Sequence, residues 1–96
     1  MKKYKVLLSA HGNPDYNQNP YEKICPCYYA EADSIEQCQK LVSKYIAEYN
    51  LGGGNWTGGK VIETSKNTHI GDISYNCCFW PAHQKLNERT LYARPL

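Results

Sequence analysis

The sequence predicts an α+β fold of two layers, in which one amphipathic helix packs on a mostly antiparallel sheet of about four strands. Apolar residues recur at three- and four-residue steps between Ser34 and Asn50, which is the spacing of one helix face. Segments in which apolar and polar residues alternate, as in strands, lie on both sides of this helix. Because 96 residues suffice for one core and not for two, residues 1–96 are predicted to form a single domain.

The first two predicted strands precede the helix. The first is expected at about residues 3–10, where two sets of residues alternate and would point to opposite faces of a strand. One set is Tyr4, Val6, Leu8 and Ala10, and the other is Lys3, Lys5, Leu7 and Ser9. The next segment, HGNPDYNQNPYEK, is rich in asparagine and proline and predicts a loop. A second strand is expected near residues 24–30, so the predicted order is strand, strand, helix, strand, strand.

The predicted helix has matching start and stop signals. Ser34 and Gln37 form a capping-box pattern, and Asp33 is the alternative cap. Gly52 is expected to end the helix in a left-handed conformation that a side chain would resist. The residues predicted to face the sheet are Ile35, Cys38, Leu41, Val42, Tyr45, Ile46 and Tyr49, and those predicted to face solvent are Glu36, Gln37, Gln39, Lys40, Ser43, Lys44 and Glu48.

Two strands and a tail are predicted after the glycine-rich loop GGGNWTGG. A short strand is expected from Lys60 to Thr64 and a longer one from His69 to Trp80. The face of the longer strand expected to meet the helix carries Ile73, Tyr75, Cys77 and Phe79. The tail, residues 81–96, is compatible with a short helix from Pro81 through Leu91 or with an extended arm.

Composition narrows the functional classes. The formal charge is +2, from 11 basic and 9 acidic residues, and the basic residues are scattered along the chain. A dedicated nucleic-acid binder usually has a more one-sided charge. The apolar part of MKKYKVLLSAHG is too short for a signal peptide, and no apolar run approaches the length of a membrane span. We therefore expect a cytoplasmic protein that does not contact a membrane.

The five cysteines are predicted to be reduced thiols that bind no metal, and no cofactor is expected. An odd count leaves one thiol unpaired in a disulfide framework, and neither Cys-Pro-Cys nor the adjacent Cys77 and Cys78 has a standard zinc spacing. Cys38 and Cys77 are interpreted as small buried hydrophobic residues. An alternative is cysteine chemistry assisted by a histidine, although no nucleophile signature surrounds any of the five.

Two compositional features point to a contact surface. Trp56 lies among five glycines, so few local side chains are expected to cover it, and we predict that it is exposed at the tip of a flexible loop. The chain also has nine tyrosines against one phenylalanine and one methionine. Tyrosine supplies a large contact area at a small cost in entropy, which suits a binding surface, but it also tolerates half-burial in an ordinary small domain.

The order of elements resembles that of known small proteins. A lysine-rich start, a strand pair, one helix opening at Ala32-Asp33-Ser34, a glycine turn and a closing hairpin with Ile73-Ser74-Tyr75-Asn76 and Trp80 are similar in layout to certain anti-CRISPR proteins of phages and mobile elements. The resemblance covers roughly residues 3–80 and is architectural. It implies a protein that binds a CRISPR effector complex in the cytoplasm of a bacterial host, prevents target DNA from entering, and does so without catalysis.

The sequence is therefore interpreted as a non-enzymatic, protein-binding inhibitor of host defence. The alternative is a small nucleic-acid or nucleotide-binding module that stacks bases on exposed aromatic residues, and a small enzyme using a cysteine or histidine comes third. The predicted partner is a protein, such as a host-defence nucleoprotein complex. The residues predicted to contact it are Trp56, Asn55, Lys60, Tyr28, Trp80 and Lys5.

Overall fold

The computed structural model describes residues 2–82 and 93–96, and it confirms a small α+β fold with one helix on an antiparallel sheet. The sheet has five strands in the order β2-β1-β3-β4-β5. This is one strand more than the predicted four, and the predicted order of two strands, helix and further strands holds. The elements are β1 (Tyr4–Leu8), η1 (Pro14–Tyr16, a 3-10 helix), β2 (Tyr28–Ala32), α1 (Ile35–Glu48), β3 (Lys60–Glu63), β4 (Thr68–Ile73) and β5 (Phe79–Pro81).

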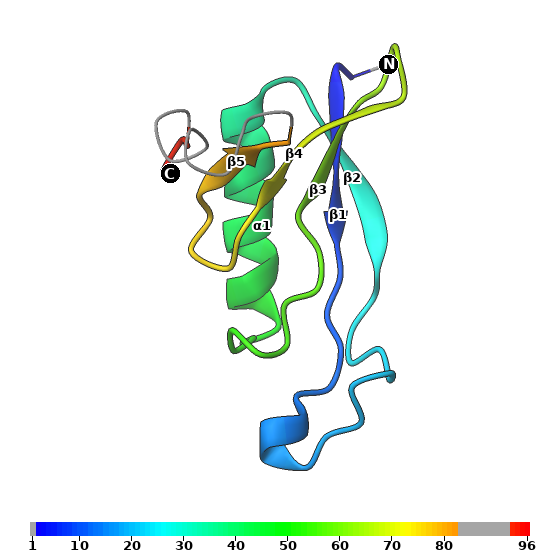
Figure 1. The fold of residues 1–96 in the computed structure, drawn as a ribbon, viewed down its shortest axis with the longest axis vertical. Helices are drawn as coiled ribbons and strands as arrows, with labels where there is room; N and C mark the ends of the chain where they lie inside the picture. Colours follow the sequence, from blue (N-terminus) through cyan, green and yellow to red (C-terminus); the bar gives the residue numbers. More distant parts are fainter. Residues whose placement is uncertain (1, 83–92) are drawn as a thin grey trace.

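The hydrophobic core lies between α1 and one face of the sheet (Figure 1). In β1 the even-numbered residues face the helix, as the alternation predicts, and Val6 and Leu8 are buried. Val42 and Tyr45 of α1 pack into the same cluster. Figure 1 also shows that the segment between β1 and β2, which contains η1, extends beyond the end of the helix.

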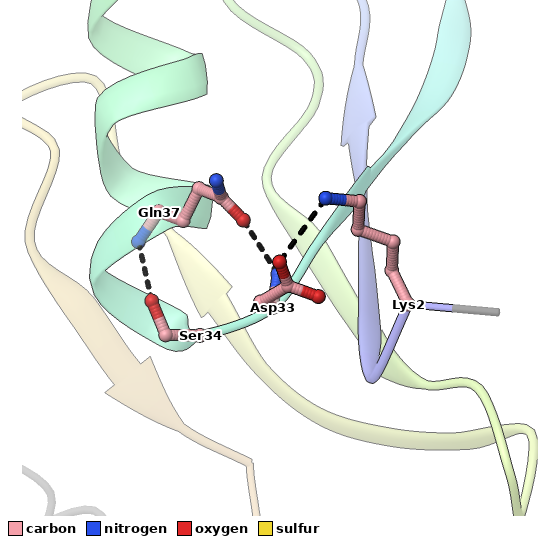
Figure 2. A network of polar contacts seen from close by, with 4 residues as sticks. All are labelled: Lys2, Asp33, Ser34 and Gln37. Atoms are coloured by element: carbon pink, nitrogen blue, oxygen red, sulfur yellow. Dashed lines mark hydrogen bonds and ion pairs between the residues drawn. The ribbon is translucent and has the colours of Figure 1, made fainter.

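The start of α1 confirms the predicted capping signal (Figure 2). Ser34 is the N-cap, and its hydroxyl accepts a hydrogen bond from the backbone N–H of Gln37 at 3.0 Å. The side chain of Gln37 in turn accepts from the backbone N–H of Asp33. Asp33, the alternative cap, instead pairs its carboxylate with Lys2 at 3.1 Å. The two hydrogen bonds between Ser34, Gln37 and Asp33 satisfy backbone N–H groups at the helix start that have no partner within the helix.

The end of α1 differs from the prediction in the residue that takes the left-handed conformation. That residue is Asn50, with φ of 49°, rather than Gly52. The N–H of Asn50 donates to Ala47 O at 3.3 Å and that of Leu51 to Ile46 O at 3.0 Å, which is a Schellman pattern. Leu51 is thereby turned into the core. Asparagine adopts this conformation more readily than most residues because its short polar side chain can hydrogen-bond locally.

The second strand begins later than predicted, at Tyr28 rather than near residue 24. Pro26 has no N–H to donate to a strand ladder, and the preceding residues make only an isolated bridge between His11 and Lys23. Regular pairing with β1 starts at Leu8 and Tyr28 and runs to Tyr4 and Ala32.

The predicted long strand from His69 to Trp80 is wrong, because the chain turns back within it and forms the hairpin of β4 and β5. Cys77 takes a positive φ of 66°, and the N–H of Ser74 donates to Cys78 O at 3.1 Å across the turn. The turn breaks the expected alternation. Cys77 and Cys78 are both buried, whereas Tyr75, which was predicted to face the helix, is 43% exposed.

Gln39 was predicted to face solvent and is instead buried at 3% exposure. Its side-chain amide donates to Cys77 O at 3.0 Å and also to Arg94 O, so it joins the helix to the β4–β5 turn and to the end of the chain. Pro81, which was considered as a helix start, is the last residue of β5. The rest of the proposed tail helix, residues 83–91, lies outside the described residues. Arg94 forms an antiparallel bridge with Phe79.

Candidate functional site

The candidate site is the face of the sheet that points away from α1. The odd-numbered residues of β1 and β2 lie on this face, and the strand register extends it across the neighbouring strands. We call it the open face. Its residues are Lys5, Leu7, Tyr29, Glu31, Lys60, Ile62, His69, Asp72 and Trp80. Within residues 2–82 and 93–96, the structure places no helix over this surface.

An apolar and aromatic strip occupies one half of the open face. Tyr29 lies opposite Leu7 in the register and is 43% exposed. The Lys5 ammonium lies 5.1 Å from the centre of the Tyr29 ring, which is within the range of a cation–π contact. Ile62 lies opposite Lys5 on β3 and is nearly buried at 6% exposure. The strip is therefore bordered by a lysine, and a nearly buried aliphatic residue lies beside that lysine on the next strand.

The other half of the open face carries charge beside a tryptophan. Asp72 lies opposite Lys60 on one side and opposite Trp80 on the other. Its carboxylate is 3.1 Å from Nε2 of His69, in a pair that is partly exposed on both sides. The indole N–H of Trp80 donates to the Ser74 hydroxyl at 3.2 Å, which fixes the direction of the ring. Basic and acidic side chains therefore lie side by side on this half of the open face.

Three of the six predicted contact residues meet on this face: Lys5, Lys60 and Trp80. Sequence reasoning did not place Leu7, Asp72 or His69 in the site. Strand alternation could have placed Leu7 in the site, because Leu7 and Lys5 are odd-numbered residues of β1 and so lie on the face opposite to Val6 and Leu8.

The expectation that Trp56 lies uncovered at a loop tip is wrong. Its indole N–H donates to Ile73 O at 3.1 Å, and its ring packs edge-on against Tyr45 with 6.0 Å between centroids. Trp56 also forms an antiparallel bridge with Ala10. The residues that cover it come from other strands and from α1, which is why its glycine neighbours gave the wrong indication.

Tyr28 and Asn55 also lie away from the open face. Tyr28 is on the helix side of β2, where its ring meets that of Tyr45 edge-on at 6.4 Å. Asn55 holds two loops together, because its side-chain amide donates to His11 O and to Gln18 Oε1, each at 3.0 Å. The glycine-rich loop is therefore tied to the loop after β1 by hydrogen bonds.

Tyr45 organises the helix side through its hydroxyl as well as its ring. The hydroxyl donates to Pro26 O at 2.8 Å and lies 2.9 Å from the sulfur of Cys25. Burial raises the pKa of Tyr45 far above its ordinary value, and the hydrogen bond with Cys25 adds to the shift. Tyr45 is therefore a neutral phenol that donates one hydrogen bond at any physiological pH.

The cysteines are free thiols in two environments. Cys38, Cys77 and Cys78 are buried, as predicted for Cys38 and Cys77, whereas Cys25 and Cys27 are partly exposed. Burial raises the pKa of Cys38 to about 11 and raises that of Cys77. Among the described residues, no group of three or more histidine, cysteine or carboxylate side chains is arranged to hold a metal ion.

Carboxylates at the start of α1 line a shallow hollow together with Ser34, Gln37 and Lys40. Asp33 pairs with Lys2, and Glu36 pairs with Lys40 at 3.5 Å one helical turn later. These exposed pairs, with the favourable position of acidic groups at a helix N-terminus, account for the acidic residues at this end of α1.

No protein-family model, no curated protein and no solved structure matches this chain. Among the helices of the described part, none is long and apolar enough to span a bilayer.

Proposed function

We propose that this chain is a non-enzymatic inhibitor that binds a protein partner through the open face of its sheet. The observation that carries the proposal is the regular surface on which Tyr29, Leu7 and Trp80 lie beside charged groups, with no described element over it. Side chains held on a sheet lose little further freedom on binding, which favours affinity. Tyrosine and tryptophan are enriched where interfaces have their strongest contacts.

The charge pattern favours a protein partner over a nucleic acid. Lys5 is opposite Glu31, and Lys60 is opposite Asp72, so each lysine on the face has a carboxylate beside it. Such carboxylates repel a phosphate backbone, whereas a protein surface can offer both signs in a complementary arrangement. The formal charge of +2 agrees with this argument.

The class of partner follows from the resemblance to anti-CRISPR proteins. In this proposal the open face binds a CRISPR effector complex in a bacterial host and prevents DNA from engaging it. Lys5 and Lys60 would then meet acidic groups of the effector at the rim of the contact. Rim charges of this kind mainly accelerate association and make it depend on salt.

The test is a phage-plating assay in bacterial strains that carry active CRISPR systems of different types. Expression of the wild-type chain should restore plaque formation by a targeted phage in at least one strain. Tyr29→Ala and Lys60→Glu should each reduce this restoration strongly, because they remove an aromatic contact and reverse a charge on the open face. Lys44→Glu is the matched control, since Lys44 is exposed on the outer side of α1 and should leave inhibition unchanged.

Two outcomes would contradict the proposal. Failure of the wild-type chain to restore plaques in any strain would remove the anti-CRISPR assignment. The nucleic-acid alternative has its own measurement, which is the binding of a labelled oligothymidine to the purified chain. Binding that weakens steeply with salt and is lost in Tyr29→Ala would favour base stacking on the open face instead.

A further inference from the structure

A chain of four hydrogen-bonding side chains continues the open face beyond Leu7. Ser9 is the first residue after β1, and its hydroxyl donates to the sulfur of Cys27 at 3.5 Å. The same hydroxyl is 2.9 Å from Thr57 Oγ1, which lies 2.7 Å from Nδ1 of His11. The chain therefore joins an imidazole to a thiol through two hydroxyl groups that come from distant parts of the sequence.

The direction of these hydrogen bonds follows from the number of protons available. A hydroxyl has one proton, and that of Ser9 is given to Cys27. Thr57 must then donate to Ser9, and Nδ1–H of His11 must donate to Thr57. In this relay, which runs from His11 through Thr57 and Ser9 to Cys27, every donor points toward the sulfur, so the hydroxyl that donates to Cys27 is itself held in place by two further groups.

Cys25 lies two residues earlier and has the opposite arrangement. The only proton of the Tyr45 hydroxyl is donated to the carbonyl of Pro26, so the contact between Cys25 and Tyr45 requires the thiol of Cys25 to be the donor. Cys25 thus donates a hydrogen bond to a hydroxyl oxygen, whereas the sulfur of Cys27 accepts one from the Ser9 hydroxyl.

Cys27 also has two backbone neighbours that accept its proton while it is a thiol. They are Cys25 O at 3.4 Å, about as close as the Ser9 hydroxyl at 3.5 Å, and Ala10 O at 3.9 Å. The hydrogen bond from Ser9 remains when the proton leaves. The three buried thiols should react more slowly than Cys27, because burial raises the pKa of Cys38 and Cys77 and limits the access of reagents to Cys78.

We propose that Cys27 is the selectively reactive thiol of this chain and that it forms a mixed disulfide with small disulfide compounds. In this step the Cys27 thiolate attacks one sulfur of the disulfide, a new sulfur–sulfur bond forms, and the original one breaks. The other half leaves as a thiolate, and the proton released by Cys27 goes to solvent. No oxidant other than the disulfide is needed. Ser9, Thr57 and His11 act as positioning residues.

The experiment measures the reaction of the reduced, full-length protein with one equivalent of the aromatic disulfide DTNB, followed by peptide mapping. Cys27 should carry most of the label and should react at least about 10-fold faster than Cys25. Thr57→Val should slow labelling of Cys27 by about 3- to 10-fold, because it interrupts the relay. Thr57→Ser keeps the hydroxyl and should react within about 2-fold of the wild type.

The controls distinguish a change in the relay from a loss of folding and from a change in partner binding by the open face. Thr57 is exposed, so both variants should keep the wild-type melting temperature, and Ser9→Ala is used only if its melting temperature is also unchanged. Equal labelling of Cys25 and Cys27, or an unchanged rate in Thr57→Val, would overturn the proposal. The readout needs no protein partner, so its outcome is independent of the phage-plating assay.

Discussion

The two faces of the sheet are formed by the same strands, yet they have opposite properties. On the face that α1 covers, Val6 and Val61 are fully buried and directly opposite each other. On the open face the adjacent residues are Lys5 and Lys60, which keep contact with water. Since neighbouring residues of a strand point to opposite sides, a shift of one residue in register would exchange the two sets. The covered face should therefore determine stability, and the open face should determine binding.

The largest expected effect is on the covered face, where Tyr45→Ala should lower the free energy of unfolding by about 3 to 5 kcal/mol. The side chain is 2% exposed and contacts Trp56, Tyr28 and Tyr49 through its ring. Urea unfolding followed by circular dichroism measures the change. Tyr45→Phe keeps the ring and should lose only about 1 to 2 kcal/mol, from the hydrogen bonds of the hydroxyl. Equal losses in the two variants would show that the hydroxyl, rather than packing, dominates.

The second prediction concerns pH and the buried thiol of Cys38. Burial raises its pKa in the folded chain from 9.0 to about 11, so between these values the unfolded chain releases a proton that the folded chain keeps. Stability is therefore fully present below pH 9.0 and declines as pH rises toward about 11. The expected loss is about 2 kcal/mol.

Urea unfolding at a series of pH values between neutral and strongly alkaline measures this decline. Cys77 and Tyr45 also have raised pKa values and contribute in the same direction. Cys38→Ala therefore serves as the control, and the part of the slope due to Cys38 should be absent from it. The same slope in both proteins would contradict the assignment to Cys38.

A smaller effect is expected at the start of α1. Ser34→Ala removes the hydroxyl that accepts the N–H of Gln37 and should cost about 1 kcal/mol. Ser34→Asp keeps an acceptor and places negative charge at the positive end of the helix, so it should restore most of the loss. Thermal unfolding of the three proteins measures the order. If Ser34→Ala is as stable as the wild type, Asp33 takes over as the cap.

The smallest effect on stability is expected on the open face. Lys60→Ala should change the free energy of unfolding by no more than about 0.5 kcal/mol, since Lys60 is exposed and its neighbour Asp72 also lies close to His69. The difference between the losses of unfolding free energy in Lys60→Ala and in Tyr45→Ala tests the comparison between the two faces. A loss near that of Tyr45→Ala would mean that the open face is part of the stabilising core.

The sequence predicted those elements whose signals lie within a few residues of each other. The helix was predicted over Ser34 to Asn50 and runs over Ile35–Glu48, with Ser34 as the cap. The strand from Lys60 was predicted within one residue of its end at Glu63. These elements are set by side-chain periodicity and by caps, which act locally.

Residues far apart in the sequence decided the features that were predicted incorrectly. Trp56 is covered by Tyr45 and hydrogen-bonded to Ile73, neither of which is near it in the chain. The segment from His69 to Trp80 alternates well enough for one strand, but its two halves pair with each other once Cys77 adopts a positive φ. Alternation alone does not show where a strand turns back.

For the candidate site, the sequence determined which side chains were available and the tertiary structure determined which of them meet. Lys5, Lys60 and Trp80 were predicted from the sequence as contact residues, and only the strand order brought them onto one face with Tyr29. The relay from His11 to Cys27 likewise depends on pairing between β1, β2 and the glycine-rich loop. The physical reason is that strand neighbours are set by long-range hydrogen bonds and by core packing, whereas helix limits and strand parity are set by adjacent residues.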